Sequence, residues 1–100
     1  MSKKIVTYIL SSLITLAPLS IASTSNQITA VGSSTVYPFL TVVAENFASD
    51  TKYNAPIIES TGTGGGMKLF CSGIGSKTPD FTNASRQIKK SEIALCNKNG

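Results

Sequence analysis

The sequence predicts an α/β fold built from three βα units, in the order βαβαβα, with a mainly parallel sheet. Short apolar, β-favouring runs alternate with stretches in which apolar residues recur at helical spacing, a pattern typical of parallel strands joined by crossover helices. In the first two units, a turn rich in hydroxyl residues and glycine stands between strand and helix. Because ligands in such sheets bind at the carboxyl ends of the strands, these turns are the first candidates for a site.

The first unit is expected to have a strand at about 27–32 and a helix at about 38–49. Pro38 suits the first helical turn, where its missing N–H needs no partner. Apolar residues at helical spacing predict one core-facing stripe on this helix, formed by Phe39, Val42, Val43 and Phe47.

The second unit is expected to have a strand at about 55–59 and a helix that begins within the glycine run and ends before Ser72. A loop rich in turn residues, 73–79, follows it. The third strand is expected at 80–84 and the last helix near 91–97. Together these elements complete the predicted βαβαβα order.

Residues 1–22 have the pattern of a cleaved signal peptide. Lys3 and Lys4 precede a short apolar core, and small residues follow it, which predicts cleavage after Ala22. The alternative is a transmembrane anchor, for which the apolar core is short. Residues 23–100 are therefore expected to form the exported part of the chain, located in the periplasm.

Cys71 and Cys96 are the two cysteines of this 100-residue chain. An even number of cysteines in an exported protein favours a disulfide. Two buried free thiols or a metal pair are the alternatives, but the chain contains no histidine and two distant sulfurs make a poor metal site. The net charge of +4 comes without the clustered Lys/Arg stripe expected of a nucleic-acid partner.

The first strand-to-helix turn carries three hydroxyl residues in succession, Ser33, Ser34 and Thr35. Hydroxyls and backbone N–H groups at a helix N-terminus suit an oxyanion. The alternative is helix capping, which Ser and Thr commonly perform. Capping needs one of these hydroxyls rather than three, and this favours a binding role.

The second turn, 63–66, opens a helix with Thr63 and three glycines. Glycine costs a helix about 1 kcal/mol per residue relative to alanine, so a run of three needs a reason. Close approach of the backbone to a ligand supplies one, and a flexible turn is the alternative. Met67 follows the run, so it matches neither a phosphate-binding P-loop nor the dinucleotide fingerprint.

Arg86 follows Ser85 at the end of the third strand. Its planar guanidinium can hold two oxygens of one phosphate, and such charge-assisted pairs are strong. The alternative is an exposed surface arginine. We expect Arg86 to reach both turns.

Three motifs resemble, in the same order, those of the periplasmic phosphate-binding proteins of phosphate ABC transporters: GSSTVYP at 32–38, TGTGGGMKLF at 61–70 and DFTNASR at 80–86. The resemblance covers about residues 28–92. It implies the N-terminal part of a type II periplasmic-binding-protein lobe, with the second lobe missing. It also implies inorganic phosphate as the ligand and an inner-membrane ABC permease as the partner, with no cofactor. The predicted phosphate-binding residues are Ser34, Thr35, Thr63, Gly64, Gly65, Ser85 and Arg86.

The chain departs from this family at Arg86, because the best-known members have an aspartate there that accepts a proton from the ligand. The resemblance therefore leaves open the selectivity between phosphate and sulfate. Two other functions remain as alternatives: an exported phosphatase or hydrolase, and an adhesin that uses the same fold. An enzyme is disfavoured, because the sequence shows no evident general base and no metal cage.

Overall fold

The computed structural model describes residues 14–18 and 27–100. The predicted cleavage site after Ala22 lies outside these residues, as does the predicted signal peptide apart from 14–18. Within the described parts, none of the helices combines the length and the apolar character needed to cross a bilayer.

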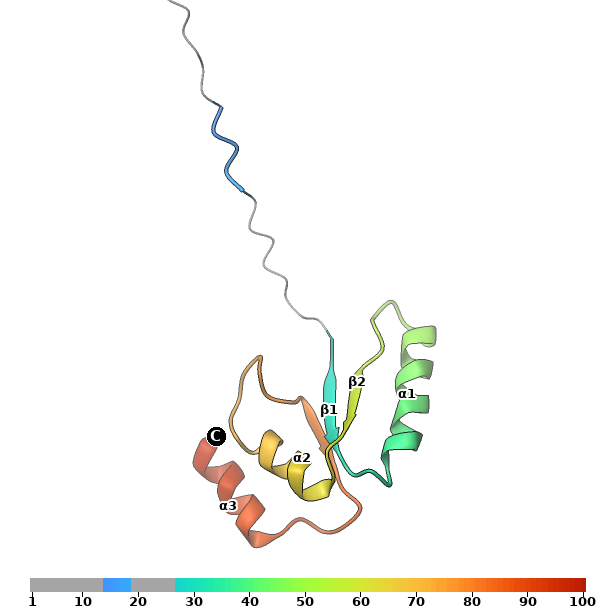
Figure 1. The fold of residues 1–100 in the computed structure, drawn as a ribbon, viewed down its shortest axis with the longest axis vertical. Coiled ribbons are helices and arrows are strands. Elements are labelled where there is room, and N and C mark those ends of the chain that lie inside the picture. The colour runs from blue at the N-terminus through green and yellow to red at the C-terminus, as the bar shows by residue number, and fades with distance from the viewer. Residues whose placement is uncertain (1–13, 19–26) are drawn as a thin grey trace, which may run out of the picture.

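Three strands and three helices alternate along residues 27–100, as the sequence predicts (Figure 1). The strands form one parallel sheet in the order β2-β1-β3. The elements are β1 (Thr29–Gly32), α1 (Tyr37–Asp50), β2 (Ile57–Ser60), α2 (Thr63–Phe70), β3 (Phe81–Asn83) and α3 (Lys90–Asn99). The predicted α/β fold and its βαβαβα order are confirmed, with boundaries that differ by at most two residues.

The central strand β1 carries the most deeply buried part of the sheet. Ala30 and Val31 keep only 7% and 3% of their surface exposed. In the parallel register, Val31 lies opposite Glu59 of β2 and Thr82 of β3. A central strand without charged residues fits this position, since both of its faces are covered.

Asp80, just before β3, fixes the amino edge of the sheet. Its carboxylate accepts hydrogen bonds from Thr29 N at 2.8 Å and Thr29 Oγ1 at 3.3 Å, and Asp80 N donates to Thr29 O at 3.0 Å. Because these bonds join the beginnings of β1 and β3, Asp80 lies at the edge opposite the strand carboxyl ends.

The helices lie on both sides of the sheet (Figure 1). Helix α1 packs against β2, whereas α2 packs against β1 and β3 and carries α3 on its outside. Strand β1 therefore leads to a helix on one side, and its neighbours β2 and β3 lead to helices on the other. Open α/β sheets bind ligands in the crevice at such a switch point, beyond the strand carboxyl ends.

Helix α2 approaches β1 so closely that residue 66 of the helix must be glycine. A Cβ placed on Gly66 would lie 2.6 Å from Gly32 Cα and 2.8 Å from Thr82 Oγ1. Met67, the next residue of α2, is buried as well. The last glycine of the run therefore serves packing between helix and sheet.

The predicted core stripe of α1 is correct only in part. Val43 and Phe47 line an open apolar groove of about 350 Å³ against the sheet, together with Leu40 and Ala44. Phe39 and Val42 do not line this groove and remain 71% and 54% exposed, and Ala44 is the buried residue of this helix. The stripe is misplaced in part because apolar residues occur around most of this helix, so spacing alone does not select a face.

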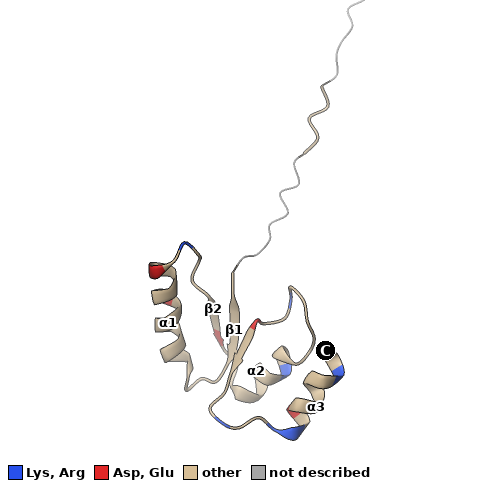
Figure 2. Ribbon diagram, turned by 180° about the vertical axis from the view of Figure 1, so that it is seen from behind, with Lys and Arg blue, Asp and Glu red and all other residues tan. Residues whose placement is uncertain are grey.

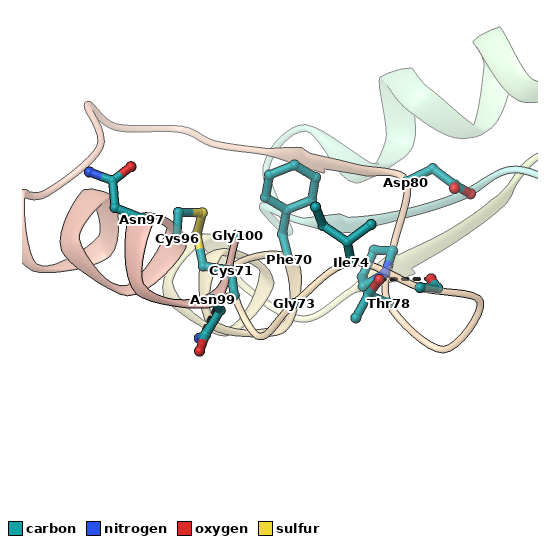
Figure 3. Close-up of a pocket in the computed structure, with 12 residues that line it drawn as sticks. Phe70, Cys71, Gly73, Ile74, Thr78, Asp80, Cys96, Asn97, Asn99 and Gly100 are labelled. Atoms are coloured by element: carbon teal, nitrogen blue, oxygen red, sulfur yellow. Dashed lines mark hydrogen bonds between the residues drawn. A yellow bond between two sulfur atoms is a disulfide. The ribbon is translucent and has the colours of Figure 1, made fainter.

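The predicted Cys71–Cys96 disulfide is present and joins the end of α2 to α3. Cys71 is 2% exposed, and its carbonyl oxygen accepts a hydrogen bond from Asn99 Nδ2 at 2.8 Å. Beside the disulfide lies an open cavity of about 480 Å³, lined by Phe70, Ile74 and Asp80 among others (Figure 3). Because Asp80 marks the amino edge of the sheet, this cavity is remote from the strand carboxyl ends.

Candidate functional site at the strand carboxyl ends

Backbone hydrogen bonds hold together the three loops that leave the sheet. Thr61 N donates to Gly32 O at 3.1 Å, and Ser33 N donates to Asn83 O at 3.2 Å. The Asn83 side chain adds a bond from its Nδ2 to Val31 O at 3.0 Å. The end of β1 is thus connected to both neighbouring strands. This role of Asn83 was not foreseen from the sequence.

In the first turn, Ser33 has a structural role close to the capping alternative, because its hydroxyl closes the turn just ahead of Val36, the N-cap residue of α1. Its Oγ accepts hydrogen bonds from Thr35 N at 3.1 Å and Val36 N at 3.3 Å, and the residue is 2% exposed. Ser34 and Thr35 are exposed, and their hydroxyls bond to no other residue in the described parts of the chain. In this turn, one serine therefore has a structural role, and the hydroxyls of the next two residues remain available to a ligand.

In the second turn, Thr63 connects α2 to the loop after β3. Thr63 Oγ1 accepts a hydrogen bond from Ser85 N at 3.1 Å and lies 3.2 Å from Ser85 Oγ. Gly62, just before the helix, has a φ of +77°, a backbone conformation that favours glycine. The structure therefore brings together two predicted site residues that are 22 positions apart.

The glycines of α2 fall into two classes. Gly66 is fixed by its contact with Gly32, whereas Cβ atoms placed on Gly64 and Gly65 would meet neighbours only at 3.6 and 3.5 Å, ordinary van der Waals separations. Both Gly64 and Gly65 are exposed on the first turn of the helix. Packing within the described lobe does not account for glycine at these two positions.

Arg86 lies at the start of α2 and is paired with an acidic residue. The atom nearest to a Cβ placed on Gly64 is Arg86 Nη2, at 3.6 Å. Arg86 Nη2 and Nη1 donate to Glu92 Oε1 and Oε2 at 2.6 and 3.0 Å. Arg86 is therefore not an unpaired surface cation, because Glu92 accepts hydrogen bonds along one edge of its guanidinium.

Glu92 belongs to the first turn of α3 and is the main residue that sequence reasoning missed. Hydrogen bonds from Arg86, and a further one from Lys89 N at 2.8 Å, lower the pKa of Glu92 to about 2. Bonding to Glu92 also raises the pKa of Arg86. The available signal was the first-turn position of Glu92, since a glutamate there commonly accepts from the residue that precedes the helix.

The predicted residues form one cluster and one neighbouring turn. Thr63, Gly64, Ser85 and Arg86 adjoin one another at the start of α2. Ser34 and Thr35 share the same edge of the sheet, but no hydrogen bond joins their side chains to that cluster within residues 27–100. The cluster combines hydroxyls, helix N-terminal N–H groups and a guanidinium, which are donors suited to a tetrahedral oxyanion.

Comparison with known proteins identifies the family. Residues 19–100 match the PBP superfamily domain. The chain belongs to the PBP superfamily.

Individual members support the same assignment. The chain is 46% identical to the protein SphX of Synechocystis over 78 residues, which cover 78% of this chain and 22% of SphX. It is 46% identical to the phosphate-binding protein PstS of Staphylococcus saprophyticus over 61 residues, which cover 61% of this chain and 18% of PstS. A crystal structure of a possible phosphate binding protein from Planctomyces limnophilus matches with a TM-score of 0.64 and 38% identity, over 74% of this chain and 25% of that one.

The matched segment is thus about a quarter or less of each of these PBP superfamily members. Charges on the described part are sparse and unevenly placed (Figure 2). Helix α1 carries only acidic residues, Glu45 and Asp50, whereas α2 and α3 carry lysines. The candidate site therefore lies on the more basic side of this PBP superfamily lobe.

Proposed function

We propose that this chain is the N-terminal part of an exported solute-binding protein that captures inorganic phosphate and delivers it to an ABC permease. In this proposal, residues 1–22 form a cleaved signal peptide, and 23–100 form part of the first lobe of a two-lobed phosphate-binding domain in the periplasm. The observation that carries the proposal is the cluster of Thr63, Ser85 and Arg86 at the N-terminus of α2. Two of the similar proteins, PstS and the Planctomyces limnophilus protein, are described as phosphate-binding proteins, which supports the same ligand.

The donors differ in kind and supplement one another. Ser34 and Thr35 supply hydroxyls from the first turn, Thr63 and Ser85 supply hydroxyls from the second turn and the β3 loop, and Arg86 supplies positive charge. Gly64 and Gly65 expose backbone N–H groups without side chains that would block an approaching anion. Such a set suits an anion, and no described residue of the cluster is placed as a general base, which favours capture over hydrolysis.

The phosphate affinity expected of this lobe alone is low. A hydrogen bond to a charged group contributes about 1.5–3 kcal/mol, whereas micromolar affinity requires about 8 kcal/mol. Association also costs translational and rotational freedom. We therefore expect residues 23–100 to bind phosphate only at millimolar concentration or more weakly, and the whole two-lobed protein to bind it tightly.

Titration calorimetry with inorganic phosphate tests the site in the protein as its gene encodes it. Thr63→Ala and Arg86→Ala should each weaken binding, the latter more strongly because it removes a charge-assisted contact. The matched controls are Thr78→Ala and Lys77→Ala, because both residues lie in the loop before β3, at the opposite edge of the sheet. Unchanged affinity in both site variants would place phosphate elsewhere. Titration with sulfate measures the selectivity.

Intact-mass analysis of the secreted or periplasmic product tests the export proposal. We expect Ser23 as its first residue. A product that retains residues 1–22 and stays with the membrane would contradict cleavage after Ala22.

A further inference from the structure

The guanidinium of Arg86 has five N–H donors, and three of them are used within the described chain. Glu92 accepts one from Nη1 and one from Nη2, across the terminal edge of the group. Gln87 O accepts the second hydrogen of Nη1 at 3.0 Å. Nη1 is therefore fully occupied.

The two remaining donors are Nε–H and the outer hydrogen of Nη2. Neither has a hydrogen-bond acceptor among residues 27–100. In a planar guanidinium these two N–H groups are parallel and form a second fork, along the side of the group. Nη2 also lies next to Gly64, at the first turn of α2. The unoccupied fork thus includes the atom closest to the helix N-terminus.

Glu92 is itself held firmly enough to orient Arg86. Lys89 N donates to its Oε2 at 2.8 Å, so the carboxylate is tied to the backbone at the start of α3. Its side chain is 14% exposed, against 33% for that of Arg86. The less exposed, backbone-tied member of the pair sets the position of the more exposed one.

We infer that Glu92 is a positioning residue for anion binding: it occupies the terminal edge of Arg86 so that the side fork, Nε and Nη2, is presented to phosphate at the N-terminus of α2. This inference rests on the proposed function. It specifies a bidentate, side-on contact to two oxygens of one phosphate group. A carboxylate that merely competed with phosphate for Arg86 would have the opposite effect on affinity.

The test uses Glu92→Asp in the protein as its gene encodes it, because this change keeps the charge and withdraws the carboxylate by one methylene. We expect phosphate affinity to fall by about tenfold, within the range of coupling found inside one hydrogen-bond network. Glu45→Asp on α1, where the side chain has no hydrogen bond in the described chain, is the control and should bind as the unmodified protein does. Affinity equal to the unmodified protein in Glu92→Asp, or tighter binding in Glu92→Ala, would overturn the inference.

Three further measurements distinguish the inference from a general loss of structure. In Arg86→Ala, adding Glu92→Asp should cause no further loss, because Glu92 acts only through Arg86; additive losses would contradict this. Arg86→Lys keeps the charge but has no side fork, so it should bind phosphate more weakly than the unmodified protein; unchanged affinity would contradict the bidentate contact. In NMR spectra of the unmodified protein, adding phosphate should shift the Arg86 Nε–H signal. An unchanged signal would mean that phosphate does not contact Nε–H. Failure of the unmodified protein to bind phosphate would instead refute the proposed function.

Discussion

The two strand-to-helix turns of this lobe have similar compositions but are stabilised in different ways. The first turn is closed by its own residues, because the Ser33 hydroxyl accepts from Thr35 N and Val36 N. The second turn depends on distant segments: Thr63 bonds to Ser85, and Gly66 packs on Gly32. A similar hydroxyl- and glycine-rich sequence therefore closes a turn locally in one place and serves tertiary packing in the other.

This difference predicts where substitutions act. A change in the first turn should affect mainly the beginning of α1. A change in the second should affect the packing of α2 on the sheet, and with it the position of Arg86. Three substitutions or conditions separate these effects, in order of decreasing size.

The largest effect is expected from Gly66→Ala. The added methyl would lie 2.6 Å from Gly32 Cα, so α2 must move away from β1. Overpacking of this kind lowers the free energy of unfolding by about 1–3 kcal/mol. Urea denaturation measures the change.

The matched control is Gly65→Ala, whose Cβ would meet Thr61 Cβ at 3.5 Å. Since alanine is favoured over glycine inside a helix by about 1 kcal/mol, this variant should be equally or more stable. Equal destabilisation of both variants would mean that close contact with β1 is not what requires glycine at position 66.

A smaller effect is expected from Ser33→Ala, in the self-contained turn. Loss of the two bonds to Thr35 N and Val36 N should lower the free energy of unfolding by about 1 kcal/mol. The adjacent Ser34→Ala should leave stability unchanged, because the Ser34 side chain is exposed and makes no hydrogen bond within residues 27–100. Thermal unfolding of the two variants compares them directly. A larger loss in Ser34→Ala would reverse the roles assigned to these serines.

The smallest effect concerns pH. The pKa of Glu92 is lowered to about 2 in the folded protein, against about 4.3 for an unperturbed glutamate. The Arg86–Glu92 pair therefore contributes stability fully above the unperturbed value, and this contribution is lost as the pH falls through about 2. Glu92→Gln should make stability less dependent on pH between these values. Because the pair remains partly exposed to solvent, the change should be modest. If the free energy of unfolding depended on pH identically in Glu92→Gln and in the unmodified protein, the pair would not stabilise the folded state.

Local patterns predicted the elements of the fold well. Strand, turn and helix alternate in the order expected, and each boundary follows from residues close to it, such as Pro38 at the start of α1 and Ser72 just beyond α2. The side of α1 that packs against the sheet could not be fully predicted in the same way. Apolar residues surround most of that helix, so the sheet selects Ala44 and Leu40 over Phe39 only in three dimensions.

The candidate site was predictable in its donors and not in its organisation. Hydroxyls, glycines and Arg86 stand out because they follow strands of a parallel sheet. The different roles of Gly66 and Gly64 depend on which side of α2 packs against β1. The pairing of Arg86 with Glu92 depends on where α3 begins. Both features depend on the tertiary structure. They decide which residues stabilise the lobe and which remain available to a ligand.

The Cys71–Cys96 bond also makes a covalent ring of the segment between these residues, and the ring contains β3 together with Ser85, Arg86 and Glu92. Lys77 lies on an exposed loop of this ring and offers a site for trypsin. A single nick there would leave both pieces in one molecule until a reductant is added. Half of the candidate anion site is thus tethered to α2 through sulfur as well as through the backbone, so the oxidised protein should survive such a nick with Arg86 still close to Gly64.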